Sequence, residues 1–396
     1  MTSAGPIPVL FVHYGDQWIR GSEQVLLELI AGLDRTQVRP ALWTNGAAMA
    51  ADARAAGVPT TLSGMAYYLD AGSPPAAPLR YLRLVGTGMA LARRHGARVI
   101  HANSAAPVQW MLPAARLSGR KLLVHLHIGY LRRSRAVLGL RFVDRAVGVS
   151  GQVLEGLIAD GLPPARARVI PNGVSVAYRL QQPAADLRAE AAVPPDALVL
   201  AAVGFLVPMK GYDVLLDALA RLPPRPAWVL LLAGDGPDRA RLAGQAAALG
   251  LGARVRFLGH VSDVTAVYRA ADLLVQPSRN EGFSLSAAEA GLFALPVVAT
   301  RVGGLPEVVT DGVTGLLVPA DQPTPLASAL ARLMGDPALR SRLGAAGAAR
   351  VRALFDPALM PARFAALYAE LAGLRASTAS ARQSWPSRGL TGPAGT

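Results

Sequence analysis

Two glutamates flank a small and apolar run in the segment RNEGFSLSAAEA, which covers residues 279–290. Such carboxylates could form an acid/base pair, bind one ligand together, or be solvated helix charges. If Glu281 and Glu289 lay on one helix, they would be about 12 Å apart along its axis and roughly 80° apart around it. Glycoside hydrolases hold their two carboxyl groups roughly 5–10 Å apart and facing one another. The spacing therefore disfavours a hydrolytic pair but leaves it open.

The residues around the glutamates favour a second interpretation. They predict a strand at 273–276, then a loop that carries Glu281, then a helix that carries Glu289 and is capped by Ser284 or Ser286. Amides at such a helix start bind phosphate. Glutamates on either side would accept hydrogen bonds from hydroxyls. A molecule with a diphosphate in the middle and a sugar at each end fits this arrangement.

A cation should complete such a site, and the chain has only two lysines, Lys121 and Lys210. Lys210 lies in the segment GFLVPMKG, directly after a predicted strand at 198–203. This strand would bring Lys210 to the same edge of the sheet as Glu281. A compact ammonium charge suits a diphosphate.

The strands and helices that must position these residues alternate regularly along the whole chain. Short apolar runs alternate with longer amphipathic stretches, which predicts parallel sheets covered by helices on both faces. Sites in such sheets lie beyond the carboxyl ends of the strands. The predicted strands are 8–13, 99–102, 121–126, 198–203, 228–233, 255–258, 273–276 and 296–299, and the predicted helices are 21–33, 78–95, 212–221, 238–249, 264–270 and 286–293.

Length and composition limit the class of protein. A chain of 396 residues predicts two domains, and 52% hydrophobic with 17% charged residues indicates globular cores. The absence of cysteine excludes disulfides and thiol nucleophiles and fits a reducing cytoplasm. No apolar run reaches the roughly 18 residues of a membrane span, and no basic stretch precedes the first apolar run. The sequence therefore predicts a cytoplasmic protein.

Positive charge is concentrated in the first half. The formal net charge is +14, and the stretch from Arg80 to Arg145 holds 13 basic residues and one acidic residue, Asp144. Such a field attracts phosphate, nucleic acid or an anionic membrane surface, although compositional drift toward arginine would produce it too. Because the stretch lacks interleaved aromatic residues, we expect no nucleic-acid partner.

Other catalytic motifs are missing or incomplete. Residues 234–236 read GDG without the third glycine of a dinucleotide fingerprint, and no Walker loop, HExxH or GxSxG motif occurs. His101, His125 and His127 lie close in sequence, but without a carboxylate cluster they make a poor metal site. We therefore expect no metal and no cofactor.

Six segments resemble, in this order, those of glycosyltransferase family four. They read ARVIPNGV, VGFLVPMKGYDVLLDAL, LLLAGDGPDRARL, VRFLGHVSDV, RNEGFSLSAAEA and LPVVATRVGGLPEVVTDGVTGLLVPADQ. The resemblance covers about residues 8–370, and the pair Glu281 and Glu289 matches the E-x7-E signature. It implies the GT-B fold: two Rossmann-like domains with parallel sheets facing across a cleft, and a C-terminal helix crossing back to the N-terminal domain.

The resemblance, together with a polar, proline-bearing stretch after residue 177, predicts the domain limits. They are an N-terminal acceptor-binding domain at 1–177, a linker at 178–196, a C-terminal donor-binding domain at 197–360, a crossover helix at 361–374 and a disordered tail at 375–396.

The activity implied by the resemblance is retaining, metal-independent transfer of a hexosyl group from a nucleoside diphosphate sugar. The acceptor would be a hydroxyl of a glycan, a lipid-linked molecule or a small molecule, in cell-surface polysaccharide or glycoconjugate biosynthesis. A lipid-linked acceptor would place the enzyme peripherally on the inner face of the cell membrane, held through its basic N-terminal half. The alternatives are a non-catalytic nucleotide-sugar-binding protein and a GT-B phosphorylase or hydrolase.

The resemblance also assigns roles to residues. Glu281 would bind hydroxyls of the donor sugar, Glu289 the ribose, and Lys210 the leaving phosphates, while His127 would line the reaction centre. Gly21 matches a glycine of the loop that closes over the donor. The predicted catalytic residues are His127, Lys210 and Glu281, and the predicted donor-binding residues are Gly21, Lys210, Glu281, Gly282, Phe283, Ser284, Leu285 and Glu289.

Two positions depart from the family pattern. Phe205 stands where an arginine is usual, and Arg20 precedes Gly21 where a second glycine is usual. Our hypothesis is that Arg20 replaces the missing charge when the domains close, which unchanged donor affinity in Arg20→Ala would refute. Asp16, in HYGDQW, is the predicted acceptor-side base, and Arg20 is the other predicted acceptor-site residue.

Overall fold

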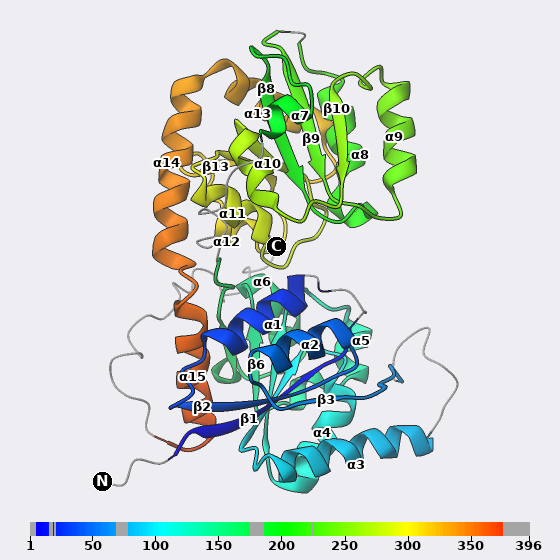
Figure 1. The fold of residues 1–396 in the computed structure, drawn as a ribbon, viewed down its shortest axis with the longest axis vertical. Helices are drawn as coiled ribbons and strands as arrows, with labels where there is room; N and C mark the ends of the chain where they lie inside the picture. The colour runs from blue at the N-terminus through cyan, green and yellow to red at the C-terminus, as the bar shows by residue number, and fades with distance from the viewer. Residues whose placement is uncertain are drawn as a thin grey trace, which may run out of the picture. The chain divides into compact units, whose positions relative to one another are not determined.

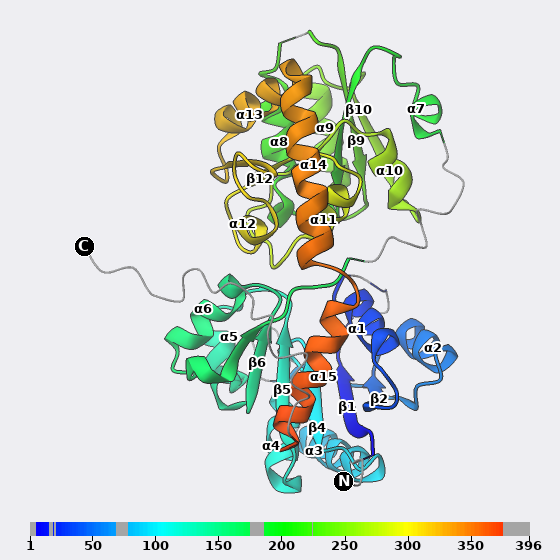
Figure 2. The same ribbon diagram turned by 90° about the vertical axis from the view of Figure 1, so that its left-hand side faces the viewer.

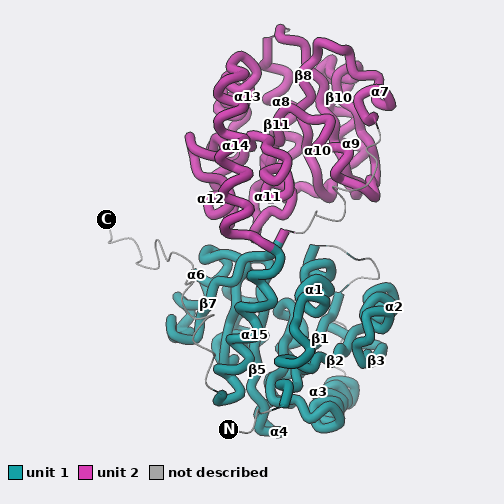
Figure 3. Tube along the Cα trace, turned by 60° about the vertical axis from the view of Figure 1, so that its left-hand side comes forward, with its two compact units in different colours: residues 1–173, 357–396 teal, residues 174–356 magenta. Residues whose placement is uncertain are grey.

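The computed structural model describes residues 5–15, 19, 21–68, 78–174, 186–223 and 225–374. The chain divides into two compact units, coloured separately in Figure 3. Unit 1 comprises residues 1–173 and 357–396, and unit 2 comprises residues 174–356. The chain leaves unit 1 after residue 173 and returns at 357, where the sequence pattern predicts 177 and 361.

Unit 1 is built on a seven-stranded sheet, in which every pair of neighbouring strands is parallel (Figure 1). The strand order is β3-β2-β1-β4-β5-β6-β7, so the chain begins in the middle of the sheet and extends it first to one side and then to the other. The strands are β1 Ile7–His13, β2 Val38–Thr44, β3 Thr60–Leu62, β4 Val99–Asn103, β5 Lys121–Leu126, β6 Arg145–Gly148 and β7 Ala167–Val169.

Helices connect the strands of unit 1 and cover the sheet. They are α1 Gly21–Gly32, α2 Ala47–Ala55, α3 Pro78–Arg94, α4 Val108–Ser118, α5 Arg132–Val137 and α6 Gly151–Ala159, with 3₁₀ turns η1 Leu140–Phe142 and η2 Pro164–Arg166. The inner strands are buried along almost their whole length, as the continuous apolar runs predict.

The last helix, α15 (Leu359–Leu371), belongs to unit 1 although it follows unit 2 in the chain. It packs on α1 and on β1 (Figure 2). Phe364 and Tyr368 are fully buried, and the Tyr368 hydroxyl lies 2.7 Å from Nδ1 of His101. The helix therefore completes the core of unit 1, as expected for a segment that returns to the first domain.

Unit 2 has a six-stranded parallel sheet in the order β10-β9-β8-β11-β12-β13. Its strands are β8 Leu198–Val203, β9 Trp228–Ala233, β10 Val255–Gly259, β11 Leu273–Gln276, β12 Val297–Thr300 and β13 Gly315–Val318. Its helices are α7 Leu187–Glu190, α8 Tyr212–Leu219, α9 Arg239–Ala248, α10 Val264–Ala270, α11 Leu285–Leu292, α12 Leu305–Val308, α13 Pro323–Gly335 and α14 Pro337–Leu354, with a 3₁₀ turn η4 Pro208–Lys210.

Two parallel Rossmann-like sheets confirm the predicted fold class. The predicted strands at 121–126, 198–203, 228–233 and 273–276 and the predicted helix at 264–270 agree with the structure residue for residue. The other predicted elements differ by one or two residues at their ends, where helices and strands fray. The predicted tail at 375–396 lies outside the described residues.

The predicted linker at 178–196 is described only from residue 186 onward. Its described part holds the short helix α7, which Asp186 caps by accepting a hydrogen bond of 3.2 Å from the amide of Ala189. Arg188, on this helix, donates a hydrogen bond of 2.8 Å to Asp272. The ion pair between Arg188 and Asp272 attaches this short helix to unit 2.

Candidate functional site

Lys210 and Glu281 meet at the carboxyl edge of the unit 2 sheet. β8 and β11 lie side by side, and the chain leaves β8 toward β9 and β10 before it returns to β11. Such a switch point opens a crevice beyond the strand ends, where ligands of open α/β sheets bind. The loop after β8 carries Lys210 and the loop after β11 carries Glu281, so that Nζ of Lys210 lies 2.7 Å from Oε2 of Glu281.

One oxygen of the Glu281 carboxylate is held by three neighbours. Besides Lys210, the hydroxyl of Ser278 donates to Oε2 at 3.1 Å and the amide nitrogen of Gln276 at 3.2 Å. The side chains of Lys210 and Glu281 are 19% and 12% exposed, respectively. Within the described part of the chain, every hydrogen bond to this carboxylate falls on Oε2, so Oε1 is the oxygen left for a ligand.

Two glycines allow the loops to approach this closely. Gly211 has φ +67°, and a Cβ there would overlap the carbonyl oxygen of Pro277. Gly303 has φ +55°, and a Cβ there would overlap the carbonyl oxygen of Glu281, which accepts a hydrogen bond of 2.9 Å from the amide of Gly304. Any side chain at these two positions would separate the loops that form the site.

The loop after β11 turns directly into helix α11. Ser284 caps the helix in the left-handed conformation, with φ +70°, and its hydroxyl accepts a bond of 3.4 Å from the amide of Ala287. The amides of Leu285 and Ser286 come before the first possible i to i−4 partner and point out of the helix start. This arrangement confirms Ser284 as the cap and leaves amides that could hold phosphate.

Phe283 occupies a different place from its predicted neighbours in the loop. Its side chain is buried, and its ring packs edge-on against Phe355 with a centroid distance of 5.0 Å. Only its backbone is therefore free to meet a ligand, whereas the ring anchors the loop in the core of unit 2. Gly282 beside it is also buried.

Glu289 lies on α11, in the helix that the sequence predicts for it. The hydroxyl of Tyr268 donates to its Oε2 at 2.7 Å. Glu281 and Glu289 thus have separate sets of partners, one on the strand-end loops and one on α10. The two carboxylates therefore occupy different positions, as they must if each is to accept a hydrogen bond from a different part of one ligand.

Arg279 is a residue whose role the sequence did not reveal. Its guanidinium makes two bonds to Asp213, of 2.9 and 2.7 Å, and one of 2.6 Å to Asp321. Its amide donates to the carbonyl of Met209 at 2.8 Å. The hydrogen bonds that Arg279 donates to Asp213 raise the pKa of Arg279, and they outweigh burial and lower the pKa of Asp213. Arg279 therefore ties the loop of Glu281 to the turn that carries Lys210.

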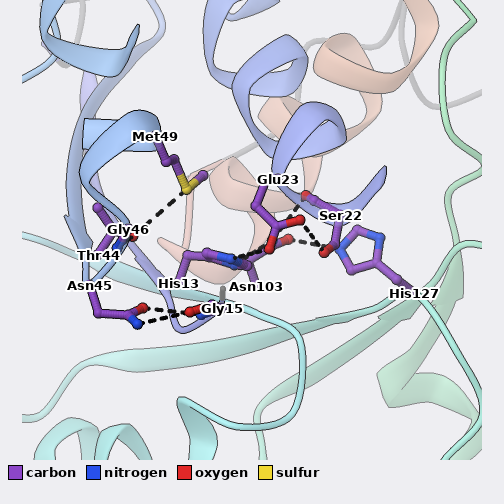
Figure 4. A network of polar contacts seen from close by, with 10 residues as sticks. All are labelled: His13, Gly15, Ser22, Glu23, Thr44, Asn45, Gly46, Met49, Asn103 and His127. Carbon is purple, nitrogen blue, oxygen red and sulfur yellow. Dashed lines mark hydrogen bonds and ion pairs between the residues drawn. The ribbon is translucent and has the colours of Figure 1, made fainter. Parts of the chain in front are cut away.

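Unit 1 contains a second buried polar network, shown in Figure 4. Nε2 of His13 lies 2.9 Å from Oε1 of Glu23, and Nδ1 of His13 lies 3.0 Å from Nδ2 of Asn103. Oδ1 of Asn103 lies 2.8 Å from Nε2 of His127. The sequence identified His127 but missed the other three. The available signal was that His13 and Asn103 both end strands, and β1 and β4 pair in register at these residues.

The pKa values of Glu23 and His127 in this network differ strongly from the ordinary values of these side chains. Burial would raise the pKa of Glu23, but its hydrogen-bond donors, first among them the His13 ring, outweigh burial and lower that pKa to about 2. Burial lowers the pKa of His127 to about 3, although the charge of Glu23 opposes the shift. At neutral pH, Glu23 is therefore ionised and His127 is neutral.

The remaining predicted residues have varied outcomes. Gly21 is the first residue of α1. Phe205, in the loop after β8, is 42% exposed. Asp16 and Arg20 lie outside the described residues, so their predicted roles stay predictions. Among the described residues, no group of three or more His, Cys, Asp or Glu side chains is arranged to hold a metal ion, and no helix is long and apolar enough to cross a membrane.

Two family comparisons together cover most of the chain. The family described as Glycosyltransferase Family 4 matches residues 19–178, and the family described as Glycosyl transferases group 1 matches residues 184–350. Similar curated proteins include D-inositol 3-phosphate glycosyltransferases from Actinosynnema mirum, 40% identical over 207 residues, and from Corynebacterium efficiens, 40% identical over 221 residues. These matches cover 49% and 52% of this chain, and 49% and 51% of the relatives. The chain thus matches about half the length of these relatives.

Solved structures share the fold over nearly the whole chain. The Anabaena protein HepE in complex with UDP has a TM-score of 0.78 at 23% identity, over 92% of this chain and 100% of HepE. Sucrose-phosphate synthase from Thermosynechococcus elongatus has a TM-score of 0.75 at 25% identity, over 92% of this chain and 99% of the synthase. With its two parallel Rossmann-like sheets and both family matches, the chain belongs to glycosyltransferase family four and has the GT-B fold.

Proposed function

We propose that this protein transfers a hexosyl group from a nucleoside diphosphate sugar to a hydroxyl, with retention of anomeric configuration. The observation that carries the proposal is the pair of Lys210 and Glu281, held at the switch point of the unit 2 sheet beside the start of α11. A cation, free helix amides and a carboxylate with one free oxygen match a diphosphate joined to a sugar.

In the proposed mechanism, Lys210 and the α11 amides stabilise the charge that builds on the departing phosphate. Oε1 of Glu281 accepts a hydrogen bond from a hydroxyl of the donor sugar, and Glu289 holds the ribose. The bond between the anomeric carbon and the phosphate oxygen breaks as the acceptor oxygen bonds to the same face of that carbon. The acceptor proton passes to an oxygen of the leaving phosphate. No protein carboxylate serves as a nucleophile in this scheme.

The comparisons guide the choice of substrates to test first. HepE has been solved with UDP and with UDP-glucose, which makes UDP-hexoses the first donors. The curated relatives are named for D-inositol 3-phosphate, which makes a phosphorylated polyol the first soluble acceptor. The basic residues of unit 1 would favour such an anionic acceptor, and they would equally favour a lipid-linked acceptor at an anionic surface.

The decisive experiment combines binding and product analysis. We expect one of UDP, GDP or ADP, or one of their sugars, to raise the melting temperature of the protein in a concentration-dependent way. NMR of the product should show the anomeric configuration of the donor. Inversion would exclude the retaining mechanism. Binding without turnover would favour a non-catalytic nucleotide-sugar-binding protein, the alternative suggested by Phe205 at the usual arginine position.

We propose that transfer needs no metal ion, because Lys210 supplies the cation beside the diphosphate site. Turnover should stay the same within error after treatment with EDTA and transfer into metal-free buffer. Restoration of lost activity by Mg²⁺ or Mn²⁺ would contradict this expectation.

We also propose that one face of unit 1 binds an anionic membrane surface from the cytoplasmic side. Leu131 is 80% exposed and Phe142 is 50% exposed, and Arg132, Arg133 and Arg141 lie between or beside them. Apolar side chains among arginines suit the boundary between headgroups and acyl chains. This face would bring the protein to a lipid-linked acceptor.

Vesicle sedimentation tests the membrane proposal. The protein should bind vesicles containing phosphatidylglycerol at low salt, and Arg132→Glu with Arg133→Glu should abolish the binding. The matched control changes Arg342 and Arg352, which are exposed on α14 of unit 2, to Glu. Equal loss in both double variants would point to net charge alone and would contradict a defined face.

A further inference from the structure

In the buried polar network of unit 1, the neighbouring groups determine which atom of each hydrogen bond is the donor and which is the acceptor. We propose that Glu23, His13 and Asn103 are positioning residues that hold His127 in the Nε2–H tautomer and present the bare Nδ1 to the ligand. The ligand group at this point would then be a hydrogen-bond donor such as a sugar hydroxyl. This inference rests on the proposed function for the identity of the ligand, whereas the tautomer itself can be measured without one.

The orientation of the Asn103 amide follows from a backbone carbonyl. Nδ2 of Asn103 lies 3.2 Å from the carbonyl oxygen of Ser22, which can only accept a hydrogen bond. The opposite orientation would set Oδ1 of the amide against that carbonyl and lose the bond. Nδ2 therefore faces Ser22 and His13, and Oδ1 faces His127.

The state of His13 follows from the orientation of Asn103. Because Nδ2 of Asn103 donates to Nδ1 of His13 at 3.0 Å, Nδ1 must be the bare nitrogen. The other nitrogen, Nε2, then carries the hydrogen and donates to the ionised carboxylate of Glu23 at 2.9 Å. Glu23 is buried and is also held by the hydroxyl of Ser22 at 3.0 Å. The carboxylate thus fixes one end of the chain of hydrogen bonds.

The state of His127 follows in the same way. Oδ1 of Asn103 can only accept, so Nε2 of His127 must carry hydrogen and donate to it across 2.8 Å. A neutral imidazole has a single N–H group. Nδ1 is therefore an acceptor, and among the described residues it has no partner. A phosphate or carboxylate oxygen, which offers no hydrogen, would be repelled at this point.

Gly15 shows how tightly the network is packed. A Cβ at this position would lie 2.5 Å from both Oε1 of Glu23 and Nε2 of His13. No other residue type leaves room for this pair. Asn45 lies beside the network and bonds both backbone groups of Gly15, at 3.0 and 2.8 Å, and within the described part of the chain no hydrogen bond joins it to Asn103. Asn45 therefore provides a matched control for changes in the network itself.

The test is NMR of the full chain labelled with ¹⁵N at its six histidines, without ligand, at pH 7. Long-range ¹H–¹⁵N correlations distinguish a protonated ring nitrogen from a bare one, and His13→Gln and His127→Gln assign the signals. We expect both His13 and His127 to be neutral with hydrogen on Nε2. Hydrogen on Nδ1 of His127, or a mixture of tautomers, in the unsubstituted protein would overturn the proposal.

Two substitutions of Asn103 separate its hydrogen bond with His13 from its hydrogen bond with His127. Asn103→Asp keeps an acceptor for His127 but cannot donate to His13, so His127 should keep its tautomer while His13 takes up a second proton. Asn103→Leu removes both links, so His127 should become a mixture of tautomers. Asn45→Ala should leave every histidine signal in its original state. A pure Nε2–H tautomer of His127 in Asn103→Leu would refute the positioning role.

Measurement of donor binding tests whether the tautomer of His127 matters for the ligand. Asn103→Leu should weaken binding of the donor roughly tenfold, which corresponds to one hydrogen bond of ordinary strength. Unchanged donor affinity would refute the link between the tautomer and the ligand. If the protein binds no nucleotide sugar at all, the proposed function fails, but the histidine signals still decide the tautomer.

Discussion

At the scale of single residues, the unit 2 site depends on one cation. Lys210 holds Oε2 of Glu281 at 2.7 Å and stands where the leaving diphosphate is expected. Because Ser278 and Gln276 also contact Oε2, the carboxylate would keep two partners if the lysine were removed. The main effect of losing Lys210 should therefore fall on the ligand and not on the loop.

We predict that Lys210→Ala weakens binding of the nucleoside diphosphate by roughly 10- to 100-fold. This range corresponds to the loss of one charge-assisted contact, about 1.5–3 kcal/mol. Isothermal titration with UDP, or with the nucleotide that binds best, measures the change. Lys121→Ala is the matched control, because Lys121 is the only other lysine and pairs with Asp144 on unit 1. Equal effects in both variants would contradict a specific role for Lys210.

At the scale of elements, the site depends on two loops held in register. Arg279 bonds Asp213 on α8 and the backbone of the η4 turn, so that the loop after β11 and the turn carrying Lys210 move as one piece. The close approaches at Gly211 and Gly303 serve the same purpose. The positions of Lys210 and Glu281 therefore depend on both loops together.

We predict that Arg279→Leu lowers donor affinity roughly tenfold although Arg279 does not contact the donor. The loss should not add to that of Lys210→Ala, because both changes act through the position of Lys210. A double-mutant cycle on donor affinity measures the coupling. Arg301→Leu is the control, since it breaks a similar ion pair with Asp311 at 2.6 Å without touching the Lys210 turn. Full additivity of the two losses would show that Arg279 acts independently of Lys210.

At the scale of the whole molecule, unit 1 is completed only by the end of the described chain. α15 brings Phe364 and Tyr368 onto His101, and Phe364 also contacts His125 with a ring-centroid distance of 4.9 Å. Neither ring nitrogen of His125 has a hydrogen-bond partner among the described residues. Two fully buried histidines therefore lie under the returning helix, and neither can accept a proton without cost.

We predict that acid destabilises unit 1 well before its carboxylates are protonated. Burial lowers the pKa of His101 to about 3 and that of His125 well below its usual 6.5, and nearby histidines add to both shifts. Below pH 6.5 these histidines bind protons in the unfolded chain but stay neutral in the folded chain. The free energy of unfolding therefore falls as the pH drops toward 3. Each such histidine contributes up to about 1.4 kcal/mol per pH unit.

Thermal unfolding between pH 7 and pH 4 measures this dependence. His125→Leu should reduce the slope of melting temperature against pH, whereas His260→Ala, at an exposed histidine of unit 2, should leave it unchanged. An unchanged slope in His125→Leu would contradict the buried-histidine explanation. Glu23 acts in the same direction at lower pH, because its pKa falls to about 2 on folding and its stabilisation is lost between pH 4.5 and 2.

Much of the unit 2 site was predictable because its signals are local. Apolar runs placed β8 and β11, serine and glycine marked the start of α11, and the positions of Lys210 and Glu281 beyond two strand ends pointed to one sheet edge. Arg279 could not be assigned in this way. An arginine in an exposed loop resembles a solvated charge until its partner, Asp213 on another helix, is known.

The polar network of unit 1 was largely hidden from the sequence for the same reason. His127 was found by resemblance, but His13, Glu23 and Asn103 come from two strands and a helix that only the sheet order brings together. The direction of their hydrogen bonds depends on a carbonyl of Ser22, whose position no residue type reveals.

The amino-acid pattern alone was sufficient for two parallel sheets, for the family, and for the placement of Lys210, Glu281 and Glu289 on loop and helix, since hydrophobic periodicity and caps act over a few residues. The tertiary structure alone decided which oxygen of Glu281 is occupied, what holds Lys210, and which nitrogen of His127 is bare. These features depend on contacts between residues far apart in the chain. The distances between such residues and the directions of their hydrogen bonds cannot be read from residue types alone.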